Sequence, residues 1–278
     1  MSLKHLFRLS RPLPSRSAIV ALACAACMAT PLAAADKSAR EVTEALVGST
    51  REAPAALTDL DLSYLDLAGL DFKGADLSHS DLYGSDFTAA NLSGAKLAHT
   101  RIDRAILINA DFSGADLERA TLLRPTIFSD MKFNRAEAPR FTGAKLVGLR
   151  VQARMDGADF TGADLTDADF SPFEDRAGEG TITTVPRNEL SNADFSRAVM
   201  KRTSFRRAVL RYVKFRDSDL SGASFVEADL TQADFSGADL AGADFTGADL
   251  ARADFSKARG LDTAKGLEQA SSQGAVLR

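Results

Sequence analysis

The sequence predicts an all-β solenoid, and three observations lead to this fold class. From Leu62 onward, long blocks of the chain carry a large apolar residue at every fifth position, with a small residue, usually alanine, two positions earlier. On an α-helix of 3.6 residues per turn, this spacing would scatter the large residues around the whole circumference. On a flat strand, an odd spacing would send successive large residues to opposite faces. The chain is therefore expected to bend once per repeat and to point its large residues inward each time.

The repeats fall into three blocks. The first and third each have fourteen large residues in register, from Leu62 to Ile127 and from Leu190 to Phe255. The middle block has six, with one residue lost after the second of them: Leu146, Val151, Met155, Phe160, Leu165 and Phe170. Glycines just before the small residue supply turn-permissive backbone for the bends, at positions 74, 94, 114, 162, 222, 237, 242 and 247. The 278-residue length, which by itself allows two domains, is thus explained by one solenoid.

The most regular run, from Gly237 to Leu250, reads GADLAGADFTGADL. It resembles the pentapeptide-repeat proteins, whose pattern is A-[DN]-[LF]-x-x, and the resemblance extends over about 200 residues. The resemblance implies a right-handed quadrilateral parallel β-helix, a pentapeptide-repeat solenoid in which five residues form one side and twenty form one coil. With strands ~4.8 Å apart, the 34 repeats would make about 8.5 coils and a rod roughly 40 Å long.

The phenylalanines provide an independent check on the number of sides. From Phe195 to Phe255 the large position alternates between phenylalanine and leucine or methionine. An alternation of period ten stacks phenylalanine on phenylalanine only if a coil has an even number of sides, which four sides satisfy and three do not. We therefore expect two stacked columns on opposite sides of the coil. One column has Phe215, Phe235 and Phe255, and the other has Phe205, Phe225 and Phe245.

The N-terminal residues 1–35 have the features of a cleavable signal peptide. Four positive charges precede a short apolar run from Ala18 to about Met28, and an Ala-Ala-Ala tripeptide precedes Asp36. An uncleaved anchor is disfavoured because the run is shorter than the ~20 residues that span a bilayer. Lipid attachment at Cys24 or Cys27 is a minor alternative. Cleavage after Ala35 predicts an exported protein, periplasmic or secreted, without cysteine.

The segments at the ends and between the blocks complete the domain organisation. Residues 36–56 are expected to form an N-terminal cap segment, with a short capping helix whose apolar stripe includes Ala39, Val42, Leu46 and Val47. The β-helix is expected over residues 57–259, with inserts near 128–140 and 171–189 that bulge from the coil. Residues 260–278 are expected to form a C-terminal cap and tail.

A search for catalytic or cofactor sites identifies no enzyme and no cofactor. The aspartates before the large residues are explained by the repeat, because there they can bind the turn backbone and solvate the rod. His79 and His99 are twenty residues apart and are expected to stack at one corner of the coil, but their neighbours in that column are Asp59 and Arg119. Two histidines make a weak metal site, so we expect none.

The clearest surface feature is a basic segment that spans one coil, which we call the basic girdle. It has eight cations and no intervening acid: Arg197, Lys201, Arg202, Arg206, Arg207, Arg211, Lys214 and Arg216. One interpretation is a docking band for an anionic partner. The alternative is a solvated surface whose charges pair with acids of the neighbouring coils, namely Asp194, Asp217, Asp219 and Asp229. The polar 171–189 insert precedes the girdle and could share its function.

Two classes of function remain. The first is a non-catalytic exported scaffold or protein-interaction module of the bacterial envelope, which binds an unknown protein or an anionic envelope polymer. The second follows from the resemblance, because some pentapeptide-repeat proteins mimic DNA and bind a type II topoisomerase such as DNA gyrase. Without the leader the chain has 30 bases against 38 acids, a net charge of −8, so direct nucleic-acid binding is not expected. Export and the girdle favour the first class. A homodimer through a solenoid end stays open.

Overall fold

The computed structural model describes residues 35–278 except 73, 131–132, 173–186, 269–273 and 276–278. By its contacts the chain divides into two units, Met1–Ala34 and Ala35–Arg278. The first unit, which includes all of the expected leader except Ala35, lies outside the described residues. The second unit contains helix α2 (Ala39–Val47), strand β1 (Thr121–Leu123), the 3₁₀ helix η1 (Arg135–Glu137) and strand β2 (Arg150–Gln152).

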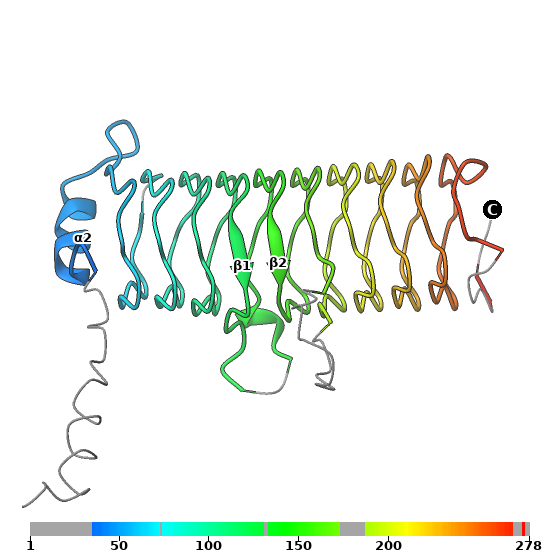
Figure 1. Ribbon diagram of the computed structural model, residues 1–278, viewed down its shortest axis with the longest axis horizontal. Helices are drawn as coiled ribbons and strands as arrows, with labels where there is room; N and C mark the ends of the chain where they lie inside the picture. Colours follow the sequence, from blue (N-terminus) through cyan, green and yellow to red (C-terminus); the bar gives the residue numbers. More distant parts are fainter. Residues whose placement is uncertain (1–34, 73, 131–132, 173–186, 269–273, 276–278) are drawn as a thin grey trace, which may run out of the picture. The chain divides into compact units, whose positions relative to one another are not determined.

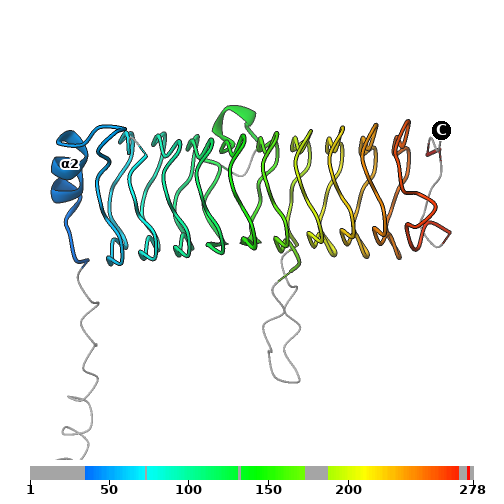
Figure 2. The ribbon, with the colours of Figure 1, turned by 90° about the horizontal axis from the view of Figure 1, so that it is seen from above.

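The second unit is a parallel β-helix, a solenoid of stacked coils (Figure 1). Residues twenty apart pair in parallel along the uninterrupted blocks, as in Asp61↔Asp81 and Asp219↔Asp239. Most described sides of a coil are so short that they contribute one bridge each. Among the described residues, only β1 and β2 pair over three residues, Thr121↔Arg150 to Leu123↔Gln152. Figure 2 shows the same stack turned by 90°. The predicted bending of the chain once per repeat is confirmed.

The bends rest on left-handed backbone at the corners. All eight glycines expected at bends have a positive φ, between 65° and 76°. Many corners use other residues in the same conformation, such as Tyr64 at φ 58° and Arg104 at φ 56°. Left-handed backbone is costly for such side chains, so the ladder of hydrogen bonds on both sides of the corner must hold it in place. Corners without glycine therefore present long side chains at the surface.

The core is built from the inward large residues, which form two columns of phenylalanine rings. One column runs Phe195, Phe215, Phe235 and Phe255, with ring centroids 4.8–5.4 Å apart, and extends backward through Phe160 and Phe141 to Phe112. The other runs Phe170, Phe205, Phe225 and Phe245. The columns meet edge to face, which is a favourable aromatic geometry. Both predicted columns are confirmed, and Phe141, which the five-residue register leaves out, joins one of them.

The coils continue past both interruptions. Asp111 pairs with Arg140 rather than with the residue twenty positions on, because an insert that contains η1 lies between the coil residues Thr126 and Arg140. At the second interruption, Asp159 pairs with Asp194. The buried Asn188 side chain joins three strands of backbone there: it accepts from Ala153 N at 2.6 Å and donates to the carbonyl oxygens of Val151 and Phe170. Most of the 171–189 insert lies outside the described residues.

Helix α2 lies at the N-terminal end of this unit (Figure 1). Ser38 begins it with a capping box, in which its hydroxyl accepts from Glu41 N and its own N–H donates to the Glu41 carboxylate. Val42 and Leu46 are buried in the same core as the coils. The prediction that Val47 belongs to this apolar stripe is wrong, because Val47 is 74% exposed. Val47 follows Leu46 directly, and each residue turns the helix by about 100°, so Val47 faces outward when Leu46 faces the core.

The ladder extends further at the C-terminal end than residue 259. Lys265 N donates to Ala243 O at 2.8 Å, and Phe245 N donates to Lys265 O at 2.8 Å. This last coil has one extra residue, because Asp244 pairs with Lys265. Gly260 lies so close to the coil below that a Cβ atom would be 2.5 Å from Ala241 N. The expected cap therefore begins as a continuation of the solenoid, with Leu261 and Leu267 packed on the core.

Candidate functional site

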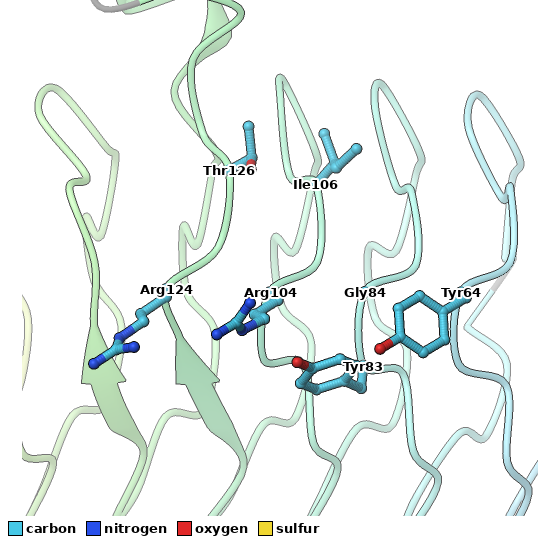
Figure 3. Close-up of a pocket in the computed structure, with 7 residues that line it drawn as sticks. All are labelled: Tyr64, Tyr83, Gly84, Arg104, Ile106, Arg124 and Thr126. Atoms are coloured by element: carbon cyan, nitrogen blue, oxygen red, sulfur yellow. The ribbon is translucent and has the colours of Figure 1, made fainter. Parts of the chain in front are cut away.

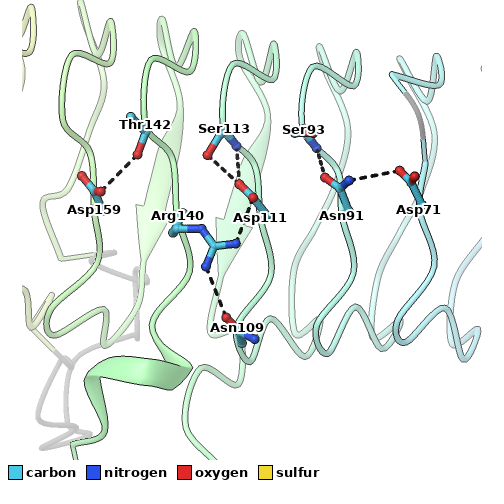
Figure 4. Close-up of polar contacts among 9 residues, drawn as sticks. All are labelled: Asp71, Asn91, Ser93, Asn109, Asp111, Ser113, Arg140, Thr142 and Asp159. Carbon is cyan, nitrogen blue, oxygen red and sulfur yellow. Dashed lines mark hydrogen bonds and ion pairs between the residues drawn. The ribbon is translucent and has the colours of Figure 1, made fainter. Parts of the chain in front are cut away.

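The aspartates of the repeat are engaged in the turns. Figure 4 shows the pattern: Asp111 Oδ1 accepts from Ser113 N at 2.9 Å and from Ser113 Oγ at 2.6 Å, while Asn91 binds Ser93 N and donates to Asp71 on the next coil. The same bond to the N–H two residues on recurs from Asp61 to Asp254. Hydrogen bonds from Thr246 lower the pKa of Asp244, so that carboxylate stays ionised. The prediction that these residues bind turn backbone is confirmed.

The two histidines stack as the twenty-residue spacing predicts. The rings of His79 and His99 are stacked, with their centroids 4.9 Å apart and an angle of 10° between the ring planes. Both occupy left-handed corners, in the same column as Asp59 and Arg119. Within the described part of the chain, no group of three or more His, Cys, Asp or Glu is placed to hold a metal ion.

The basic girdle runs around one coil. Arg197, Arg202 and Arg207 occupy three successive left-handed corners. Lys201, Arg206, Arg211 and Arg216 each lie immediately before a corner, and Lys214 lies on a side, where it pairs with Asp194 and Asp234 in the ladder. The eight charges therefore face outward in all directions around the coil, and no side of the coil carries all of them.

Six of the eight girdle cations form ion pairs with acids on neighbouring coils. The pairs are Lys201–Asp219 at 3.2 Å, Arg202–Asp167 at 2.7 Å, Arg207–Glu227 at 3.7 Å, Arg211–Asp229 at 2.5 Å, Lys214–Asp194 at 3.0 Å and Arg216–Asp234. Asp194, Asp219 and Asp229 were expected as partners. Asp217, also expected, instead lies against Gly237, and no ion pair to it is observed among the described residues. Each of these exposed pairs contributes little to stability, because water screens the two charges.

Arg197 and Arg206 are the two girdle cations without an ion pair to a described residue. Arg206 lines a shallow depression of about 360 Å³ together with Arg150, Ser171 and Pro172. This depression is where the chain enters the second insert. The girdle and the start of that insert therefore lie side by side, as the chain order suggested.

A pocket of about 530 Å³ lies over the first block of repeats, far from the girdle in sequence (Figure 3). It is lined by Tyr64, Tyr83, Gly84, Arg104, Ile106, Arg124 and Thr126. We call this the tyrosine–arginine pocket. Our sequence reasoning missed it, although the signal was present: Tyr64, Gly84, Arg104 and Arg124 are spaced by twenty residues. The four positions are corners of four successive coils.

The aromatic part of this pocket is held in place on several sides. Tyr64 and Tyr83 meet edge to face with ring centroids 5.4 Å apart. The Arg101 guanidinium lies 4.6 Å from the Tyr83 ring and is itself bound by both carboxylate oxygens of Asp81. Desolvation and the neighbouring Tyr83 raise the pKa of Tyr64 above its ordinary value, so its hydroxyl stays neutral at physiological pH.

The basic part of the pocket differs from the girdle. Neither Arg104 nor Arg124 has a carboxylate within ion-pair distance among the described residues, and both side chains are exposed. The lining of the pocket contains no acid. Arg104 and Arg124 occupy the same corner of adjacent coils, so their like charges lie close together. No ion pair with a described acid offsets either charge, and the two arginines form a local positive site.

Fold and surface together define a class of protein: a repeat solenoid whose polar side chains serve its turns and whose surface carries charged and aromatic patches. The pentapeptide-repeat family description, "Pentapeptide repeats", matches the chain in eight copies, over residues 55–94, 85–122, 140–171, 189–225 and 223–259. The chain belongs to the pentapeptide-repeat family. A right-handed β-helix solenoid is the fold that goes with this membership, and the match indicates no enzyme family.

Several solved structures are similar. HetL, a pentapeptide repeat protein involved in heterocyst differentiation regulation from the cyanobacterium Nostoc sp. strain PCC 7120, is 26% identical with a TM-score of 0.49, covering 87% of this chain and 93% of HetL. A pentapeptide repeat protein from the Arabidopsis thaliana thylakoid lumen is 39% identical with a TM-score of 0.29, covering 31% and 58%. QnrB1, a plasmid-mediated fluoroquinolone resistance protein, is 17% identical with a TM-score of 0.36, covering 76% and 88%. No curated protein sequence matches the chain significantly.

Proposed function

We propose that this protein is a non-catalytic, exported scaffold of the bacterial envelope that presents the surface of its β-helix to a binding partner. The observation that supports this most is the continuous ladder from Ala56 to Lys265, with every inward large residue buried in one core. Such a ladder makes a stiff surface with charged groups at fixed spacings. A stiff surface binds without losing conformational entropy, which suits a scaffold.

Two finer features of the fold belong to the same proposal. The coil is four-sided, which the twenty-residue pairing and the two phenylalanine columns support. Helix α2 acts as a cap, supported by the burial of Val42 and Leu46 against the first repeats. A solenoid needs a polar cover at its end because an open strand edge promotes association. Helix α2 provides this cover at the N-terminal end of the solenoid.

Export rests on the leader. Its four positive charges, its short apolar run and the alanines before Asp36 are typical of a cleaved signal peptide, with a periplasmic or secreted product. Among the described residues, no helix is long and apolar enough to cross a membrane.

The basic girdle is the proposed docking surface for a protein partner. Its exposed ion pairs contribute little to stability, so a partner's acids can replace the internal ones at low cost. Arg197 and Arg206 add two cations that the described acids do not neutralise. Together they favour an anionic partner.

Chemical cross-linking in whole cells, followed by mass spectrometry, tests the scaffold proposal. We expect cross-links to an envelope protein, which the triple variant Arg206→Glu, Arg207→Glu and Arg211→Glu should lose. The matched control is Arg252→Glu on the distal coils, which should keep them. Cross-links to a type II topoisomerase would contradict the proposal and favour DNA mimicry. Cross-links between two copies through one solenoid end would show a homodimer without contradicting export.

A further inference from the structure

The tyrosine–arginine pocket is built as a line along the solenoid. Tyr64, Gly84, Arg104 and Arg124 are corners of four successive coils, so with strands ~4.8 Å apart they span roughly 14 Å. In Figure 3 the two arginine side chains run in the same direction along the row of coils, and both phenol hydroxyls point toward the arginines. The pocket therefore has an aromatic end and a cationic end.

The aromatic end depends on Gly84. A Cβ atom at position 84 would lie 2.8 Å from Cδ1 of Tyr64, so the glycine leaves the room in which this ring lies flat over the corner. The Tyr64 side chain is nonetheless 57% exposed. A large ring that is exposed and already fixed offers contact area at a low entropic cost, which is the use of tyrosine in binding surfaces.

The cationic end selects the charge of the ligand. A guanidinium presents its donors as a planar fork that fits a carboxylate with two parallel hydrogen bonds. Arg104 and Arg124 lie one coil apart, and neither forms an ion pair with a described acid, although Asp103 binds the backbone N–H of Leu123 nearby. Two carboxylates with a similar separation would neutralise both, whereas the paired Arg101 is already saturated by Asp81.

We propose that this pocket binds an acidic glycan, a linear sugar chain with a carboxylate on successive rings, such as a polyuronate. A sugar ring packs on the exposed face of Tyr64, and the carboxylates of the next units bind Arg104 and Arg124. The open shape of the pocket, with Ile106 and Thr126 on its other wall, leaves both ends of the line free for a polymer. This inference rests on the proposed role as an envelope scaffold, and it moves the polymer contact from the girdle to the first block of repeats.

Titration calorimetry of the full-length protein with tetragalacturonate, at ionic strength ~0.15 M, tests this site. We expect measurable binding that the double variant Arg104→Gln and Arg124→Gln weakens by about tenfold or more, since two charge-assisted pairs are lost. Tyr64→Ala should weaken binding severalfold, and Tyr64→Phe should retain it. The matched control is Arg252→Gln with Lys257→Gln, two exposed left-handed corners of the C-terminal coils. It removes the same charge and should leave the affinity within about twofold.

Three results would overturn the assignment. Equal weakening by the Arg252→Gln and Lys257→Gln control would mean that binding follows net charge alone. Equal binding of the methyl-esterified tetramer would mean that the carboxylates are not recognised. Polyphosphate or polyglutamate binding more tightly than the glycan, with no effect of Tyr64→Ala, would mean that the ligand needs no sugar ring. Circular dichroism of each variant serves as the control for folding, because it should give the same spectrum as the wild-type protein.

The failure of this inference can be told apart from failure of the scaffold proposal. A protein that binds tetragalacturonate but stays in the cytoplasm would contradict export and keep the site. An exported protein that ignores the glycan would contradict the site and keep the scaffold.

Discussion

A single buried asparagine shows how the solenoid tolerates an interruption. The Asn188 amide is fully buried and bonds one backbone N–H and two carbonyl oxygens, where the chain returns from the second insert. In the regular repeats, the carbonyl oxygen of the large residue accepts a turn hydrogen bond from the N–H three residues on, as Phe72 does from Ala75. At Val151 and Phe170 the Asn188 amide donates to the corresponding oxygens. A residue that the repeat pattern does not require therefore completes the hydrogen bonding of the core.

Replacing Asn188 by leucine should lower the free energy of unfolding by roughly 2–4 kcal/mol, because it leaves three buried backbone groups unsatisfied. Urea unfolding followed by circular dichroism measures the change. The exposed Asn192 occupies a left-handed corner, so Asn192→Gly should change stability by less than about 0.5 kcal/mol. A leucine variant as stable as the wild type would show that Asn188 does not hold the two ends of the coil.

The turn aspartates predict how stability depends on pH. Hydrogen bonds from Ser63 lower the pKa of Asp61, and bonds from Thr246 lower that of Asp244, relative to an unfolded chain. A depressed pKa in the folded state means that the stabilisation is complete above the unfolded value and is lost as the pH falls through the folded value. Urea midpoints should thus change little between about pH 7 and 5 and decrease steadily below about pH 4. A midpoint that rises on acidification would contradict the role of these carboxylates.

At the scale of the element, helix α2 tests the capping role. Its two buried apolar side chains, Val42 and Leu46, face the first repeats, and its polar face is turned outward. Val42→Asp should loosen the helix from the core and expose the edge of the first coil, so that the protein self-associates as its concentration rises. Val47→Asp is the matched control, because Val47 is 74% exposed. Sedimentation velocity should give a monomer for the control and larger species for Val42→Asp; identical profiles would remove the capping role.

The repeat elements were predictable from sequence because their rules are local and periodic. The alternation from Phe195 to Phe255 was enough to predict both ring columns. The re-entry of the chain after each insert was not, because the ladder spacing is 29 residues across the first insert and 35 across the second, and loop length does not say which side the chain rejoins. The tyrosine–arginine pocket was hidden for another reason: it is formed by outward positions that the repeat leaves free. Only alignment of the sequence in rows of twenty would have brought Tyr64, Arg104 and Arg124 together.

At the scale of the whole molecule, charge is distributed in ladders and not as a uniform field. The six girdle ion pairs show that a run of eight cations in sequence is largely neutralised by the coils above and below. The two arginines of the pocket form no ion pair with a described acid. On this solenoid, the partners of a charged residue lie one coil away, at separations of 18, 20 or 35 residues in the girdle, so a basic segment in the sequence is a poor guide to basic surface. We therefore expect that added salt lowers the affinity of the pocket for the glycan. The free energy of unfolding should change little, because the exposed girdle ion pairs contribute little to it.

The central claim, that this solenoid works as an exported envelope scaffold, is tested most directly by the mass of the protein recovered from fractionated cells. We predict that the chain in the periplasm or medium begins at Asp36, with residues 1–35 removed. Full-length protein confined to the cytoplasm, with its leader intact, would contradict the claim.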